Sequence, residues 1–445
     1  MVLVSLPAVI KMATIPLDAS KGSGFGFSTL TSWLLWLVLC TTAYPTRNAT
    51  RQEEDSHWVA TWVSMPQLVE PNNMPPSPFS GAAAFKDATL RQTLHLSIGA
   101  ERLRFQISNT FGGSDLPITE ASVALPFGGN AGVSSIDTTT LKGLTFNGSA
   151  SVTIPRGQVA YSDPVDFKVD PQAMITVSLY SQAGQAGSSI TGHPGSRTTS
   201  WMQQGNGINA SAVTGANIAH WYFLSAIEAW APRTTAALVI LGDSITDGRG
   251  STDNANNRWP DLLLARMQQE GITNIAVCNQ AAGGNTVLTG GLGPPLIQRY
   301  QRDLLTTAGV KYALIFEGVN DIGSASTDSG TQTRIGSSLQ SSFKIIATDA
   351  KAAGLTVIGA TITPFGGNGQ SYSNPTRDQT RQIVNKWILG GGDGSFDETI
   401  DFAAIVADHS NGTNLDTQYD GGDHLHLNVM GYQAIVIQFP LYIFV

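Results

Sequence analysis

A serine that follows an apolar run is the first residue whose type and position suit covalent chemistry. The run ends in the segment 241–248, which reads LGDSITDG. A serine at a tight, glycine-flanked strand exit can present its Oγ to solvent at the edge of a sheet, as an attacking nucleophile requires. Gly-Asp-Ser alone is a weak signal, and Ser244 taken alone is more simply a helix N-cap. The segment therefore supports two hypotheses, a nucleophile and a cap.

Two further segments carry groups that can stabilise an oxyanion. Segment 279–285 reads NQAAGGN, and consecutive glycines let backbone N–H groups approach a ligand closely. Segment 317–321 reads EGVND, where the side-chain amide of Asn320 can donate to developing negative charge. An ordinary turn is the simpler explanation of each segment in isolation, with Asn320 and Asp321 bonding their own loop.

A fourth segment, 419–428, reads YDGGDHLHLN. Asp423 and His426 are three residues apart, so in a turn both side chains can face one side, with the carboxylate fixing the imidazole tautomer. His424 is expected at a pocket rim or packed. A metal site is the alternative, because the two histidines stand among several carboxylates: Asp401, Asp408, Asp416, Asp420 and Asp423. No histidine or cysteine pair has zinc-site spacing, which disfavours this alternative.

The elements that must position these segments differ between the two halves of the chain. From about 57 to 231, apolar residues alternate with polar ones, as in 94–98, 103–107 and 175–179. This period is typical of half-buried antiparallel strands. The turn 99–101 predicts a hairpin between the first two of these runs. We predict a β-sandwich-like domain over residues 57–231.

After Pro232 the apolar residues form continuous runs, which are typical of strands buried on both faces of a parallel sheet. The runs are 236–241, 275–278, 312–316 and 356–362. Helical stripes lie between them, namely Ile335, Leu339, Phe343, Ile346 and Ala350 before Gly354, and Ile383, Val384, Trp387 and Ile388 before Gly390. We predict a three-layer α/β/α domain with a parallel, flavodoxin-like sheet over residues 232–445.

Ligands of open parallel sheets bind beyond the carboxyl ends of the strands. All four segments fall in chain order at strand exits or loops on that edge. Each signal is weak alone, but the combination indicates one site.

In this combination the sequence resembles the SGNH hydrolases of the GDSL lipase/acylhydrolase superfamily. The blocks of that family correspond to Gly242-Asp243-Ser244, to Gly284 in Gly-Gly-Asn, to Asn320 in Gly-Val-Asn-Asp, and to Asp423 and His426 in Asp-x-x-His. The resemblance covers nearly the whole mature chain and is to the secreted two-domain branch with a β-rich domain first. Departures from the family pattern are Ala281, Thr286, Leu427 and the apolar tail 439–445. The Gly-x-Ser-x-Gly signature of the α/β-hydrolases is absent.

The resemblance implies a serine hydrolase that needs no cofactor and no metal. Ser244 would be the nucleophile, His426 the general base, and Asp423 the residue that orients His426. An oxyanion hole would be formed by Gly284 and Asn320 together with the backbone N–H of Ser244. The implied reaction is hydrolysis of a carboxylic ester through an acyl-enzyme.

Composition and charge narrow the possible partners and compartment. The 445 residues carry a net charge of -8 and no basic block, so nucleic acid is not an expected partner. The apolar stretch 33–40 is too short to span a bilayer and predicts a signal peptide over residues 1–45, hence secretion; a buried helix or a signal anchor is the alternative. Cys40 lies inside that leader, so Cys278 has no partner for an internal disulfide in the mature chain. Sequons that permit N-glycosylation occur at Asn48, Asn147, Asn209 and Asn411.

We therefore expect a secreted serine esterase that removes short acyl groups, with acetyl groups on plant-wall polysaccharide as the candidate substrate. Segments 246–257 and 366–373 are rich in small polar residues, which suits a hydrated sugar ester better than a lipid surface. A modest acyl pocket is expected from Leu288, Leu292, Pro294 and Pro295. An arylesterase or lipase of the same superfamily is the alternative within this class. A catalytically inactive carbohydrate-binding or cell-surface protein and a metal-dependent hydrolase are the alternatives from other classes.

Overall fold

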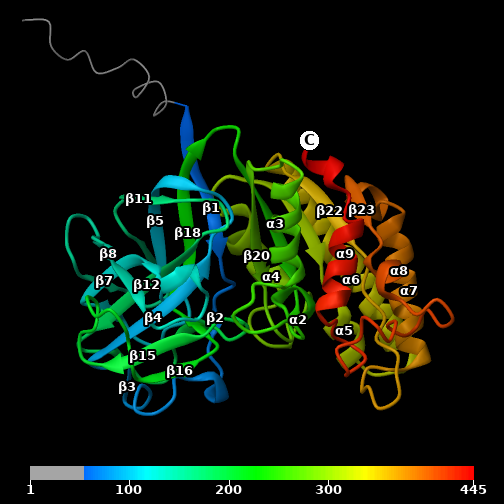
Figure 1. The fold of residues 1–445 in the computed structure, drawn as a ribbon. Coiled ribbons are helices and arrows are strands. Elements are labelled where there is room, and N and C mark those ends of the chain that lie inside the picture. Colours follow the sequence, from blue (N-terminus) through cyan, green and yellow to red (C-terminus); the bar gives the residue numbers. More distant parts are fainter. Residues whose placement is uncertain (1–54) are drawn as a thin grey trace, which may run out of the picture. The chain divides into compact units, whose positions relative to one another are not determined.

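Antiparallel sheets dominate the first half of the chain (Figure 1). The computed structural model describes residues 55–445. One five-stranded sheet has the order β1 (Ser56–Val63), β18 (Leu224–Pro232), β5 (Ala100–Ser108) and β10 (Val159–Tyr161), with β11 (Val165–Val169) also paired to β5. A six-stranded sheet has the order β16 (Ala216–Ile218), β15 (Ser200–Gln204), β4 (Ala88–His95), β12 (Met174–Ser181), β7 (Glu120–Pro126) and β8 (Ile136–Gly143). Apolar residues of both sheets belong to one continuous core, and the predicted β-sandwich-like architecture is confirmed.

Short strands and turns complete this β-rich part. One small sheet has the order β17 (Trp221–Tyr222), β14 (Thr191–His193) and β2 (Gln67–Leu68). Two strand pairs are β13 (Gln185–Ala186) with β3 (Ala83–Ala84), and β6 (Leu116–Ile118) with β9 (Val152–Ile154). The single turns of 3-10 helix here are η1 (Pro71–Asn73) and η2 (Phe127–Gly129).

The hairpin predicted around residues 99–101 is wrong. β4 belongs to the six-stranded sheet and β5 to the five-stranded sheet, so the chain crosses between sheets at this point. The backbone N–H of Leu96 donates to Ala173, which leads into β12, whereas the N–H of Ser97 donates to Thr61 of β1. Because alternating apolar residues face the common core in either arrangement, the period-two pattern does not distinguish a hairpin from such a crossing.

The expectation of half-buried strands holds for β5 but is wrong for β4 and β12, which are buried on both faces. Arg91 on β4 is fully buried, and its guanidinium donates to the Ser178 hydroxyl and to the carbonyls of Ser134, Gly207 and Ala210. Loops that fold over the outer face of the sheet therefore provide hydrogen-bond acceptors for polar side chains. The alternating sequence pattern alone predicts that these side chains face solvent.

A parallel five-stranded sheet forms the second half, with the order β20 (Ile275–Ala281), β19 (Ala236–Gly242), β21 (Val310–Phe316), β22 (Thr356–Ala360) and β23 (Glu398–Ile400). The first four strands match the predicted apolar runs, and β23 was not predicted. β19 is buried along its whole length, as expected of a central parallel strand. The order reverses direction beside β19, which is the usual place for a ligand site in such sheets.

Helices cover both faces of this sheet, so the predicted three-layer α/β/α architecture is confirmed (Figure 1). Packed against one another on one face are α3 (Trp259–Gln269), α8 (Phe402–Val406) and α9 (Val429–Gln438). On the other face lie α4 (Leu296–Tyr300), α5 (Val319–Ser324), α6 (Ser329–Ala352) and α7 (Pro375–Leu389). The remaining short elements are α2 (Ser244–Asp247), a π-helical turn η3 (Gln301–Leu305), and the 3-10 turns η4 (Gly392–Gly394) and η5 (Leu441–Phe444). No helix within residues 55–445 combines the length and the apolarity needed to cross a membrane.

The two predicted helical stripes fare differently. On α6 the side chains of Leu339, Phe343, Ile346 and Ala350 are buried as predicted, with Ile335 partly buried. On α7 the buried apolar side chains are Val384 and Ile388, whereas Ile383 is 55% exposed. Ile383 therefore belongs to the solvent-facing side of α7, and its assignment to the buried stripe is wrong.

The β-rich part and the parallel sheet contact each other directly, through β1 and β20. The backbone N–H of Ala60 donates to Ala308, and the Ser97 hydroxyl donates to the carbonyl of Val277 at 2.9 Å. Residues 55–445 accordingly form a single compact unit, and the domain bounds 57–231 and 232–445 stay a prediction. The signal peptide predicted over residues 1–45, with Cys40, and the sequon at Asn48 lie outside the described residues.

Candidate active site

Ser244 begins α2 directly beyond the carboxyl end of β19. The helix is capped by Asp243, whose side chain accepts the backbone N–H two residues later at 3.0 Å. A side chain at Gly242 would not fit, because its Cβ would lie 2.7 Å from Thr246 Oγ1. Ser244 is thus not the cap, contrary to the simpler of the two hypotheses, and it lines a pocket at this edge of the sheet.

His426 lies in the loop before α9 and links Ser244 to Asp423. Its Nε2 is 2.7 Å from Ser244 Oγ, and its Nδ1 is 2.7 Å from Asp423 Oδ2. The other carboxylate oxygen, Oδ1, accepts the backbone N–H groups of Leu425 and His426 at 3.1 and 2.8 Å. Three residues separated by up to 182 positions therefore form one hydrogen-bonded chain.

The surroundings of these hydrogen-bonded residues determine their protonation states. The pKa of His426 lies below its ordinary value, mainly because the ring is buried. Asp423 raises this pKa, whereas the positive charges of Arg249 and Arg197 lower it further. Burial raises the pKa of Asp423, but hydrogen bonds from His426 and Leu425 outweigh it and leave that pKa below the ordinary value. At neutral pH the imidazole is therefore neutral and the carboxylate is charged. This is the state in which Nε2 can accept a proton.

His424 takes no part in this chain. Its Nδ1 lies 2.5 Å from Asp420 Oδ2, and its side chain is 43% exposed. The placement agrees with the expectation that His424 is a rim or packed residue rather than a partner of Ser244.

The carboxylates considered for a metal site hold their own loops instead. Asp401 accepts the N–H of Ala404 and caps α8, and Asp408 and Asp416 accept backbone N–H groups of their own turns. Across residues 55–445, no group of three or more His, Cys, Asp or Glu side chains is arranged to hold a metal ion.

Gly284 and Asn320 meet Ser244 in the same pocket. Gly284 has a φ of +68°, which favours glycine, and its carbonyl accepts a hydrogen bond from Leu292. Asn320 Nδ2 donates to the carbonyl of Asn285 at 2.7 Å, which leaves one amide N–H uncommitted. Among the described residues, the backbone N–H groups of Ser244 and Gly284 have no hydrogen-bond acceptor. Three donors therefore stand ready near the Ser244 hydroxyl.

Arg299, which was not among the predicted site residues, forms hydrogen bonds with all three of these segments. Its guanidinium is fully buried and donates to the Gly242 carbonyl, to Asn285 Oδ1 and to Glu317 Oε2 at 3.2, 2.9 and 3.3 Å. Burial raises the pKa of Glu317 to about 8, although the positive charge of Arg299 lowers it. Burial likewise raises the pKa of Asp243 to about 7. One side chain thus ties together the ends of β19, β20 and β21.

The pocket around Ser244 has a volume of about 320 Å³, and part of its wall comes from the β-rich half. The contributing residues are Gln67, Glu70, Asn73, Pro194, Gly195 and Arg197. Sequence reasoning missed all of them, because none belongs to a recognisable block. The α/β half adds Arg249, Leu292 and Tyr372, and the Tyr372 hydroxyl donates to Asn320 Oδ1 at 3.0 Å.

Comparison with known proteins identifies the second half of the chain. Residues 240–434 match the model of the GDSL-like Lipase/Acylhydrolase family. No curated protein matches the chain. Similar solved structures include a lipase/acylhydrolase from Enterococcus faecalis, at 21% identity over 46% of this chain and 93% of that one, with a TM-score of 0.35. An acetyl xylan esterase from Geobacillus stearothermophilus is 19% identical over 46% of this chain and 93% of its own, with a TM-score of 0.34. Residues 240–434 therefore form a domain of the GDSL-like lipase/acylhydrolase family, and the enzyme is a carboxylic ester hydrolase.

Proposed function

We propose that Ser244 is the nucleophile, His426 the general base and Asp423 the residue that orients His426. The observation that carries this assignment is the pair of 2.7 Å contacts that run from Asp423 through His426 to the Ser244 hydroxyl. Asp423 accepts a hydrogen bond from Nδ1–H of His426, so the ring proton is held on Nδ1. Nε2 is then free to accept the proton of the Ser244 hydroxyl. The lowered pKa of His426 keeps that nitrogen unprotonated at neutral pH.

The reaction proceeds in two halves. Ser244 Oγ attacks the ester carbonyl carbon while its proton passes to His426 Nε2, and the carbonyl oxygen becomes an oxyanion. The C–O bond to the alcohol then breaks, and the leaving alkoxide takes the proton from His426. A water molecule, deprotonated by the same nitrogen, attacks the acyl-enzyme and releases the acid. Ser244 recovers its proton at the end, so the balance is ester plus water to acid plus alcohol.

The oxyanion is stabilised by the free N–H of Asn320 and by the backbone N–H groups of Gly284 and Ser244. Asn320 is held in place on both sides of its amide, since Nδ2 donates to Asn285 and Oδ1 accepts from Tyr372. Such a donor needs no reorganisation when the charge develops, which is the condition for a large catalytic effect.

Asn320→Ala is expected to lower kcat by about 10² to 10³, with little change in KM, because the lost donor acts mainly on the transition state. Steady-state kinetics with a nitrophenyl acetate measures both constants. Asn217→Ala, at an exposed position on β16 outside the pocket, is the matched control. A raised KM with kcat preserved would make Asn320 a substrate-binding residue instead.

The proposed substrate is a short acyl ester, with acetyl groups on plant-wall polysaccharide as the candidate. The pocket of about 320 Å³ suits a small acyl group beside a sugar, and most of the residues that line it carry polar side chains. Of the four residues expected to form an acyl pocket, only Leu292 lines it, so the expectation for Leu288, Pro294 and Pro295 is not met. Each further acyl methylene contributes about 0.8 kcal/mol only if it is buried, and the aliphatic side chains that line this pocket are Pro194, Leu292 and Leu425.

A chain-length series tests this proposal. We expect kcat/KM on nitrophenyl esters to fall steeply beyond about four to six acyl carbons, and acetate to be released from acetylated xylan. A rate that rises toward long chains and jumps at the micellar threshold would favour the lipase alternative.

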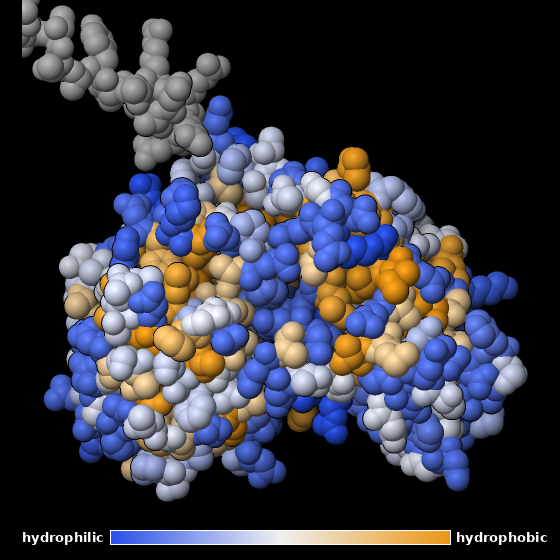
Figure 2. Space-filling model, viewed as in Figure 1, coloured by the Kyte–Doolittle hydropathy of each residue, from blue (hydrophilic) through white to orange (hydrophobic). Residues whose placement is uncertain are grey.

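The distribution of apolar side chains on the surface bears on the same alternative. On the face shown in Figure 2, apolar residues gather over α9, whereas hydrophilic residues cover the seam between the β-rich part and the parallel sheet. Activity that disappears with chelators would favour a metal-dependent hydrolase.

We also propose that the enzyme is secreted and glycosylated. Its support is the apolar stretch 33–40 with small residues after it, together with three sequons, Asn147, Asn209 and Asn411, at exposed positions in turns. Sequencing the N-terminus of enzyme recovered from the culture medium tests the cleavage site.

A further inference from the structure

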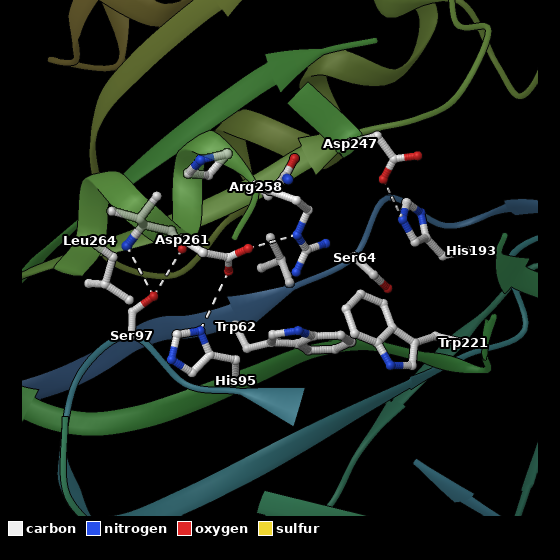
Figure 3. A pocket seen from close by; sticks show the side chains of 14 residues that line it. Trp62, Ser64, His95, Ser97, His193, Trp221, Asp247, Arg258, Asp261 and Leu264 are labelled. Atoms are coloured by element: carbon white, nitrogen blue, oxygen red, sulfur yellow. Dashed lines mark hydrogen bonds and ion pairs between the residues drawn. The ribbon is translucent and has the colours of Figure 1, made fainter. Parts of the chain in front are cut away.

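The loop after β14 brings the β-rich half against the serine turn. His193 at the end of β14 places its Nε2 2.9 Å from Asp247 Oδ1, and both side chains are only 4% exposed (Figure 3). The other ring nitrogen, Nδ1, lies 3.1 Å from the carbonyl of Met65. At Gly195 a Cβ would lie 1.7 Å from Asp247 Oδ2, so only glycine lets the loop lie this close. The loop position is therefore tied to α2, on which Ser244 stands.

Arg197 follows two residues later and lines the catalytic pocket together with Arg249 of the serine loop. Neither guanidinium has a hydrogen bond or an ion pair with any of the described residues. The Nε of Arg197 is moreover buried and without an acceptor. A buried donor without a partner destabilises the fold, so an unpaired arginine here needs an explanation other than stability.

The carboxylates near this pocket are already engaged with other groups. Glu70 accepts the side-chain amides of Gln67 and Asn73 at 2.5 and 3.0 Å. Asp247 is held by His193, and Asp423 is held by His426. These carboxylates keep their charge, but none of them forms an ion pair with either guanidinium. Both line the same pocket as Ser244 and His426, and their charge contributes to the lowered pKa of His426.

We propose that Arg197 and Arg249 bind an anionic group of the substrate, the carboxylate of a uronic acid next to the acylated sugar, so that the enzyme prefers esters on acidic polysaccharides. This inference rests on the proposed function and names its substrate class. An arginine fork matches the two oxygens of a carboxylate, or those of a phosphate. The polar side chains that line the pocket, such as Gln67 and Asn73, favour a sugar acid over a lipid phosphate. In this role the β-rich half supplies one of the two specificity residues.

Paired substrates that differ only in charge test the proposal. Acetylated polygalacturonate and the same polymer with its carboxylates methyl-esterified carry identical acetyl groups, and release of acetate is measured from both. The intact enzyme should show a kcat/KM about tenfold to a hundredfold higher on the charged polymer, the range of a charge-assisted hydrogen bond. Added salt should raise KM for the charged polymer and leave KM for the methyl-esterified one nearly constant.

Arg197→Gln and Arg249→Gln should each lower the ratio of kcat/KM between charged and neutral polymer, by about tenfold or more in the double variant. Arg249 is exposed, so its variant stays folded even if Arg197→Gln does not. Arg156→Gln, at an exposed loop position outside the pocket, should leave the ratio and the activity unchanged.

The outcomes separate this inference from the proposed function. If nitrophenyl acetate is hydrolysed but the two polymers are cleaved equally, the anionic preference is wrong while the esterase assignment stands. If nitrophenyl acetate is not hydrolysed, the proposed function itself fails. Deacylation of lysophosphatidate faster than of acetylated polygalacturonate would assign the arginine pair to a phosphate and overturn the uronic acid.

Discussion

Ser244→Ala is expected to leave a folded protein whose kcat on nitrophenyl acetate is lower by about 10⁴ to 10⁶, the usual effect of removing a triad nucleophile. The physical reason is that no other hydroxyl is in contact with His426 within the described residues: its Nε2 contacts only Ser244 Oγ. The Ser244 hydroxyl lines a pocket and contributes little to packing, so its loss should change the thermal unfolding midpoint by no more than a few degrees.

An organophosphonate provides the second measurement, because it reacts with the activated serine and leaves a mass label. We expect the label on Ser244 in the native enzyme and on no serine in Ser244→Ala. Ser337→Ala, at an exposed position on α6, is the control and should retain full activity and labelling. Labelling of a different serine, with Ser244→Ala still active, would overturn the assignment.

The sequence was sufficient to predict the parallel sheet and the meeting of four segments at its edge, for a physical reason. Buried parallel strands read as continuous apolar runs, and their carboxyl ends lie on one edge, so residues after 241, 281 and 316 must approach one another. The segment with His426 was assigned to this edge because it completes the set of family blocks, and not because of a predicted strand before it. Distances such as the 2.7 Å between Ser244 and His426 needed the structure.

The remaining parts have no periodic signature. In the sequence Arg299 is a single polar residue on a short helix, and its spacing does not indicate that its guanidinium is buried among five oxygen acceptors. His193 and Asp247 are 54 residues apart and lie in halves of different architecture, so only the packing of the loop after β14 brings them together. Arg197 depends on that same packing. Contacts between the two halves are therefore the part of the site that sequence patterns cannot supply.

His426→Ala is expected to abolish activity nearly as fully as Ser244→Ala, with a loss of about 10⁴ to 10⁶ in kcat, because the two side chains act as one unit. His424→Ala is the matched control in the same loop, since His424 contacts Asp420 and not Ser244. We expect His424→Ala to lower kcat by less than about tenfold. A larger loss from His424→Ala than from His426→Ala would mean that the base is misassigned.

The pH profile gives an independent check on His426. The base must be unprotonated to accept the serine proton, so kcat/KM falls as the pH drops through the pKa of His426 in the free enzyme. Burial, together with the charges of Arg249 and Arg197, holds that pKa below its ordinary value despite the opposing effect of Asp423. The acidic limb should therefore lie below about pH 6.5, the ordinary midpoint for histidine. Replacing Arg249 by glutamine removes a positive charge and should move this limb to higher pH, whereas a limb that stays in place would mean that Arg249 does not act on the catalytic base.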